Sequence, residues 1–100
     1  MTNNIDKEKY MSNMMANLQM LRAKLGMTQS ELCYLAGVSR QTIVNAEKNN
    51  KMIWNTYLSL IFVFSHNEET LSLMKFLDIY PKEYGTILKS TIEKTEREER

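Results

Sequence analysis

Side chains of the types that contact DNA bases recur at helical spacing in the middle of the chain. One stripe, at positions i, i+3, i+4 and i+7, consists of Gln41, Val44, Asn45 and Lys48, and Arg40 stands beside it. Positions with this spacing share one face of a helix, so these side chains can enter a groove together. Arginine pairs bidentately with guanine, glutamine and asparagine pair with adenine, and valine contacts the thymine methyl group. The same stripe also fits an ordinary solvated helix face, so the elements around it must distinguish the two interpretations.

The segment before the stripe carries a complete set of helix start signals. Thr28 can cap a helix, and Glu31, three residues later, can close a capping box. Met27 and Leu32 have the spacing of a hydrophobic staple around that cap. These signals predict a helix from Gln29 to about Ala36.

A short turn that contains glycine separates this helix from the one that carries the stripe. Gly37 suits the left-handed conformation that ends a helix, and Ser39 is placed to cap a helix from Arg40 to about Asn49. Two helices joined by such a tight turn are typical of a helix-turn-helix. The inner positions of this motif must be apolar or small, and the sequence places there Leu32, Cys33, Ala36, Val38, Ile43 and Ala46.

Hydrophobic periodicity predicts further helices on both sides of this pair. Apolar residues recur at helical spacing from Met14 to Leu25, which predicts a first helix that ends at Gly26. The preceding residues lack this periodicity, and we expect a flexible arm over residues 1–13. The apolar stretch after Ile53 fits a helix or a strand, and we favour a helix over Asn55–Phe64 because a lone strand would have no sheet to join.

The remaining signals predict two more helices and complete an all-α fold. Asn67 can cap a fifth helix, Pro81 predicts a break, and a sixth helix is expected from Thr86 to Arg100, with a charged end that frays. We therefore expect a compact bundle of five to six helices. Its helix-turn-helix domain spans residues 14–80, and residues 81–100 form a C-terminal helical extension that is a candidate dimerisation element.

The distribution of charge says more than the net charge of +1. Residues 14–56 carry five basic and two acidic side chains, a net charge of +3, whereas residues 57–100 carry six basic and eight acidic side chains, a net charge of −2. Affinity for phosphate must therefore come from the first half of the chain.

Other classes of function find little support in the composition. Cys33 is the single cysteine and His66 the single histidine, so no metal site is expected, and no cofactor either. His66 is expected at the solvent or at a helix end. No set of Ser/His/Asp, Cys/His or paired carboxylates falls on a shared face, so the chain is not expected to be an enzyme. The polar N-terminal segment, the short apolar runs and the unpaired cysteine predict a cytoplasmic protein without a membrane span.

The segment LRAKLGMTQSELCYLAGVSRQTIVNAEKN resembles the helix-turn-helix of the lambdoid phage repressors, the Cro-type proteins and the wider bacterial XRE family. The resemblance covers roughly residues 18–50, about a third of the chain. It rests on the TQxEL start, the glycine turn, the SRxTI start and the glutamate that follows. It implies a lambda-repressor-like fold and a sequence-specific transcriptional regulator, such as a repressor, that binds double-stranded DNA in the major groove.

The resemblance also implies a role for each matching residue. Residues that would contact bases are Arg40, Gln41, Val44 and Asn45. Residues that would contact phosphates are Gln29, Ser39, Lys48, Asn49, Asn50 and Lys51. Arg22 and Glu47 match an internal salt bridge of the family, so Glu47 is interpreted as structural.

Two positions depart from the family pattern. Cys33 stands where the family usually has alanine, and we assign the thiol to the core rather than to a redox sensor because it is small enough to pack there. The family also tends to have a glycine soon after Glu47, where this chain has the sequence EKNNKMIWN. The loop after the third helix therefore departs from the family pattern, whereas the helices before it keep that pattern. Downstream of Trp54 the dimer surface is not carried over from the family.

The sequence leaves alternatives open for the assembly of the chain and for its function. One motif covers too few base pairs to find a genomic site, which predicts a symmetric homodimer held mainly by the apolar second half of the chain. The alternative is that the later helices fold back and close the core of the monomer. A second function also stays open, an antitoxin-like protein-interaction module whose DNA binding serves autoregulation.

Overall fold

Six helices make up all the regular secondary structure of residues 4–98. The computed structural model describes these residues, with side chains through residue 93. The helices are α1 (Lys7–Lys24), α2 (Gln29–Ala36), α3 (Arg40–Lys48), α4 (Trp54–Phe64), α5 (Glu68–Phe76) and α6 (Glu83–Glu98). The expected all-helical fold is therefore confirmed for the described part of the chain.

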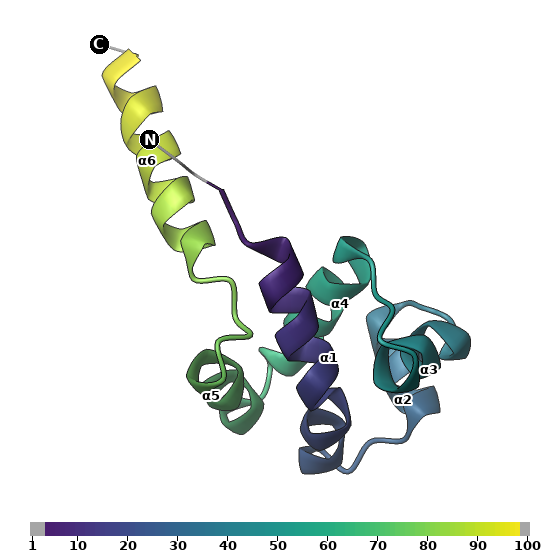
Figure 1. Cartoon of the computed structure of the whole chain (residues 1–100). Helices are drawn as coiled ribbons and strands as arrows, with labels where there is room; N and C mark the ends of the chain where they lie inside the picture. The colour runs from purple at the N-terminus through teal and green to yellow at the C-terminus, as the bar shows by residue number, and fades with distance from the viewer. Residues whose placement is uncertain (1–3, 99–100) are drawn as a thin grey trace.

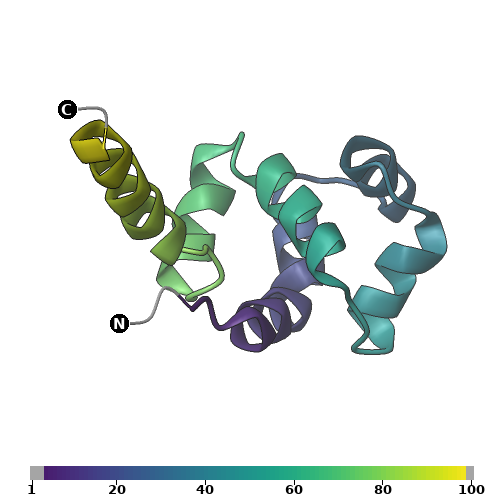
Figure 2. The same ribbon diagram turned by 90° about the horizontal axis from the view of Figure 1, so that it is seen from above.

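The two central helices are α1 and α4, and the other helices are arranged around them (Figure 1). Helix α1 packs against α3, α4 and α5, while α2 packs against α3 and α4. Figure 2 shows the same order from above, with α2 and α3 at one end of the molecule and α6 at the other. The polar stripe of α3 and the C-terminal helix therefore lie far apart.

Local signals set the ends of α2. The amide of Glu31 donates to Thr28 Oγ1 at 3.0 Å, and the amide of Thr28 donates to Glu31 Oε1 at 2.9 Å. This is the predicted capping box. At the other end Gly37 takes the left-handed conformation, with φ +72°, and its amide donates to the carbonyl of Cys33 at 2.9 Å. The predicted bounds of α2 are confirmed because each cap is satisfied within the helix and its neighbours.

The predicted inner positions divide into two groups. Leu32, Ile43 and Ala46 are buried in the core. The others, Cys33, Ala36 and Val38, are half-buried and pack against the core from its edge. The thiol of Cys33 lies 3.2 Å from the carbonyl oxygen of Ser30. The cysteine therefore packs beside the core rather than within it.

The expectation of a flexible arm over residues 1–13 is wrong for residues 7–13, which form the first turns of α1. Asp6 caps this helix by accepting a hydrogen bond from the amide of Lys9 at 3.1 Å. Tyr10 is fully buried, and its hydroxyl donates to Glu83 Oε1 at 2.5 Å. The helix extends this far because Asp6 caps its first turn and because Glu83, distant in sequence, binds the buried Tyr10. Residues 1–3 lie outside the described part of the chain.

The C-terminal helices follow the predicted order, but α4 begins at Trp54 rather than at Asn55, and α6 also begins earlier than predicted. The ambiguous apolar stretch is helical as α4, and Asn67 caps α5 by accepting from the amides of Glu69 and Thr70. Helix α6 begins at Glu83 rather than at Thr86. The earlier start places Glu83 against Tyr10, so the helix gains an anchor on the body. The fraying predicted for the chain end falls on residues 99 and 100, outside the described residues.

The substitution Tyr10→Ala tests the ordered start of α1. It removes a fully buried aromatic side chain, so we expect it to lower the free energy of unfolding by about 3 kcal/mol, measured by urea denaturation. The control is Ser12→Ala, which changes an exposed residue of the same helix and should cost less than about 0.5 kcal/mol. If the two variants were equally stable, Tyr10 would contribute nothing to the folded state, and the expectation of a flexible arm over these residues would stand.

Candidate nucleic-acid interface

A buried ion pair fixes the position of α3 on the rest of the molecule. Arg22 Nε donates to Glu47 Oε2 at 2.8 Å, and Arg22 Nη2 donates to Glu47 Oε1 at 3.1 Å. The carboxylate side chain is 0% exposed, whereas that of Arg22 is 21% exposed. Arg22 Nη1 also donates to the carbonyl oxygen of Met27 at 2.9 Å. The pair implied by the family resemblance therefore joins α1 to α3 and to the loop before α2.

The electrostatics of the pair favour the ionised state of both partners. Burial alone would raise the pKa of Glu47, but hydrogen bonds from Arg22 and Gln29 and the charge of Arg22 outweigh it. The pKa of Glu47 therefore lies below its ordinary value. The hydrogen bond to Glu47 in turn raises the pKa of Arg22. A charged pair at this position leaves no net charge beneath the exposed surface of α3.

Gln29 belongs to the same network. Its Nε2 atom donates to Glu47 Oε1 at 2.9 Å, so one of its two amide hydrogens points into the protein. The other hydrogen remains available to a ligand at the start of α2. The predicted phosphate contact of Gln29 thus stays a prediction, and the structure adds a second role in which this residue links α2 to α3.

Packing of one face of α3 leaves the predicted base-contacting residues on the other side. Ile43 and Ala46 point into the core, with exposed fractions of 0% and 1%. Residues Arg40, Gln41 and Lys48 are exposed, while Val44 and Asn45 are half-buried. The predicted stripe is therefore accessible, with its long polar side chains outermost.

Three amide side chains form a hydrogen-bonded row along α3. Gln41 Nε2 donates to Asn45 Oδ1 at 3.0 Å, and Asn49 Nδ2 donates to the same oxygen at 2.9 Å. Each pair spans four residues, one helical turn, which is the spacing at which side chains on a helix surface meet. The row holds Asn45 in one orientation before any ligand arrives.

The other predicted phosphate-contacting residues lie at the two ends of α3. Ser39 is exposed, and its hydroxyl caps the helix by accepting from the amide of Thr42 at 3.1 Å. At the C-terminal end Asn49, Asn50 and Lys51 are all exposed. Asn50 has φ +53°, a left-handed conformation that asparagine adopts more readily than most residues. Asn50 therefore supplies a left-handed residue in the loop where the family tends to have glycine.

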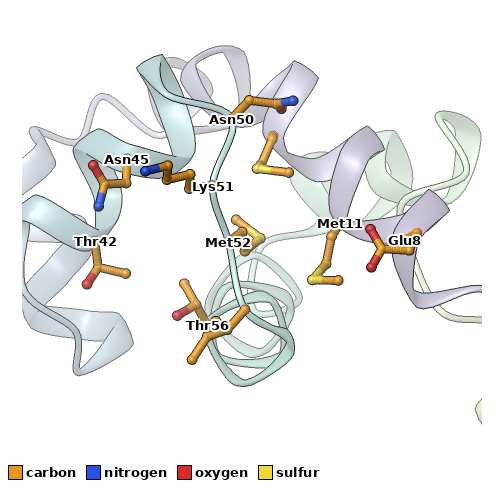
Figure 3. Close-up of a pocket in the computed structure, with 10 residues that line it drawn as sticks. Glu8, Met11, Thr42, Asn45, Asn50, Lys51, Met52 and Thr56 are labelled. Atoms are coloured by element: carbon orange, nitrogen blue, oxygen red, sulfur yellow. The ribbon is translucent and has the colours of Figure 1, made fainter.

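A groove of about 500 Å³ runs beside α3, between the start of α1 and the start of α4 (Figure 3). Its apolar lining comes mainly from methionines, and its polar lining comes from α3, the following loop, Glu8 of α1 and Thr56 of α4. The lining residues are Glu8, Met11, Met15, Thr42, Asn45, Asn50, Lys51, Met52, Ile53 and Thr56. The groove thus continues the accessible surface from Asn45 to Lys51.

Sequence reasoning missed most of the groove lining, and on α3 it missed Thr42 and the second role of Asn49. Thr42 lines the groove, and its hydroxyl lies 2.8 Å from that of Ser39, but it was not assigned to the site. Asn49 was assigned to phosphate contact alone, although its spacing of four from Asn45 signals a side-chain pair on a helix. The spacing of Asn45 and Asn49 can be seen in the sequence, whereas the groove forms only when α1 packs against α3.

No family model, no curated protein and no solved structure matches this chain. Among the described residues, no helix combines the length and the apolar character needed to cross a membrane.

The substitution Glu47→Gln tests the ion pair. It leaves Arg22 without its charged partner in a largely buried position, so we expect a loss of about 3 kcal/mol in the free energy of unfolding at neutral pH. Because the pKa of Glu47 is lower in the folded chain than in the unfolded chain, its stabilisation is complete above the unfolded pKa and is lost as pH falls through the folded pKa. The stability difference between wild type and variant should therefore shrink in acid.

A matched control is Glu69→Gln. Its carboxylate pairs with Lys24 at 3.4 Å on the surface, where both side chains are largely exposed. Exposed pairs contribute little, so the loss should stay below about 1 kcal/mol. A Glu47→Gln penalty that did not change between neutral and acidic pH would contradict the assigned role of the carboxylate charge.

Proposed function

We propose that this chain is a sequence-specific transcriptional regulator that binds double-stranded DNA. Helices α2 and α3 form a helix-turn-helix, and α3 enters the major groove. The observation that carries the proposal is the outer face of α3, where amide and guanidinium side chains suited to base edges project from a helix whose opposite face is anchored in the core. The resemblance of residues 18–50 to the XRE family supports the same assignment.

The charges around α3 suit a polyanion. Arg40, Lys48 and Lys51 are exposed on this helix and the loop that follows it. The nearest acidic side chain on the helix, Glu47, is buried and paired with Arg22, so it does not oppose them. The exposed charge of α3 and of the loop that follows it is therefore positive, although exposed Glu8 of α1 lines the adjoining groove. Attraction of Arg40, Lys48 and Lys51 to phosphates supplies the sequence-independent part of binding.

Selection of bound sequences from a random duplex pool tests the proposal. We expect wild type to enrich a defined motif and to bind less tightly as salt rises. Gln41→Ala should change the preference at its own base position, at a cost of about 1–3 kcal/mol there, because it removes a base contact. Lys51→Ala should instead weaken binding to all sequences alike. It should also reduce the slope of log affinity against log salt concentration by about one, because one phosphate contact is lost.

The matched control is Lys75→Ala, which removes an exposed lysine from α5 and should change neither affinity nor preference. Absence of an enriched motif, or affinity that is the same at low and physiological salt, would overturn the proposed function.

We also propose that the regulator acts as a symmetric homodimer through α6. This helix projects from the body of the molecule (Figure 1). Leu88 and Ile92 lie one turn apart on it and are 59% and 58% exposed. An antiparallel pair of α6 helices, related by a two-fold axis that passes between Leu88 and Ile92, would cover these side chains in both copies.

Analytical sedimentation tests the dimer. We expect a species of twice the 11.8 kDa chain mass at micromolar concentration, and dissociation of that species in a Leu88→Glu, Ile92→Glu double variant. Both side chains are exposed in the monomer, so the variant should keep its fold. The control is Ser90→Glu, which places one glutamate on the opposite side of α6. A wild-type monomer, with one copy bound per DNA site, would overturn the dimer.

A further inference from the structure

The side-chain oxygen of Asn45 is occupied from both sides along α3. It accepts hydrogen bonds from Gln41 Nε2 at 3.0 Å and from Asn49 Nδ2 at 2.9 Å. An amide oxygen has two lone pairs, so these two bonds use its acceptor capacity. What Asn45 still offers to a ligand is the pair of N–H donors on Nδ2.

An Asn45 side chain whose oxygen is already occupied does not fit the usual pairing of asparagine with adenine. That pairing needs an acceptor for the adenine N6 amino group and a donor for N7. Guanine presents two acceptors, O6 and N7, on its major-groove edge. A side chain with only donors to spare therefore fits guanine, whereas adenine can be bound bidentately only after one of the two existing bonds is broken.

We propose that Asn45 selects guanine over adenine at its base position, and that Asn49 is the positioning residue that sets this preference. The inference rests on the DNA-binding function proposed above and assigns a base to that site. Gln41 differs from Asn45, because it donates only one hydrogen to the row and keeps its own oxygen and a second N–H. Gln41 thus retains the capacity to bind adenine.

The expected preference is modest. Each amide pair at this spacing on a helix surface shifts an equilibrium by a factor of about two. Keeping both bonds with guanine, and losing one or both with adenine, therefore gives about a two- to fivefold preference for guanine. Removal of Asn49 frees one lone pair of Asn45 Oδ1, which should cut this preference by about half and shift the selected base toward adenine.

Selection from a random duplex pool with four proteins tests the inference. Asn45→Ala locates the base position, since its preference is lost there. Wild type should select guanine at that position, and Asn49→Ala should shift the selection toward adenine. The control is Asn50→Gly, which removes a neighbouring exposed amide and tolerates the left-handed conformation of that residue. This variant should bind less tightly while keeping the wild-type base.

Adenine at the located position in wild type overturns the inference and leaves the proposed function standing. Guanine that is retained in full by Asn49→Ala overturns the positioning role of Asn49. Absence of duplex binding by wild type overturns the proposed function and this inference together.

The amide row can also be tested without DNA. In nitrogen-edited NMR spectra of the free protein, Asn49→Ala should shift the side-chain amide signals of Gln41 and Asn45, because both share the oxygen that Asn49 contacts. Asn50→Gly should leave those signals in place. Unchanged signals in Asn49→Ala would overturn the row itself, whatever the outcome of the selection.

Discussion

The ion pair of the buried Glu47 carboxylate is the interaction on which the position of α3 depends. Taking a carboxylate out of water is costly, and the cost is offset only when a charged partner and further hydrogen bonds satisfy it. Arg22 supplies the charge from α1, and Gln29 supplies an additional donor from α2. One side chain of α3 is thus tied to two other helices, and the three must assemble together.

The orientation of α3 follows from this anchor. Glu47 lies next to Ala46 and one turn after Ile43, so the paired carboxylate and the apolar contacts fix the rotation of the helix from the same side. The polar stripe is then presented outward by geometry, because its members lie on the remaining faces. Within the stripe the amide row restricts Asn45 further. Two sets of contacts therefore order this surface. The core beneath α3 fixes the helix, and hydrogen bonds between neighbouring side chains fix Asn45.

The opposite end of the molecule is held by contacts that span longer stretches of chain. Tyr10 and Glu83 are 73 residues apart in sequence, and their hydrogen bond attaches the start of α6 to the start of α1. Asn13 adds a bond from α1 to the carbonyl of Asp78 at 2.9 Å. Beyond these attachments α6 projects with exposed apolar side chains. Because this helix is separated from α3, the proposed dimer contact and the proposed DNA contact would not compete for the same surface.

Sequence by itself determined the features that are satisfied locally. The capping box of Thr28 and Glu31, the left-handed Gly37 and the cap at Ser39 each close within a few residues, so the bounds of α2 and the start of α3 follow from residue types and spacing. The start of α1 also has a local signal that the sequence analysis did not use, the cap of Asp6 on the amide of Lys9. Tertiary structure alone decided that Tyr10 and Glu83 meet, because these side chains lie 73 residues apart and come together only after α1 and α6 have packed. It also turned Gln29 toward Glu47, 18 residues away. Local hydrogen bonds can be predicted from the order of residues, whereas these contacts exist only after the helices have packed.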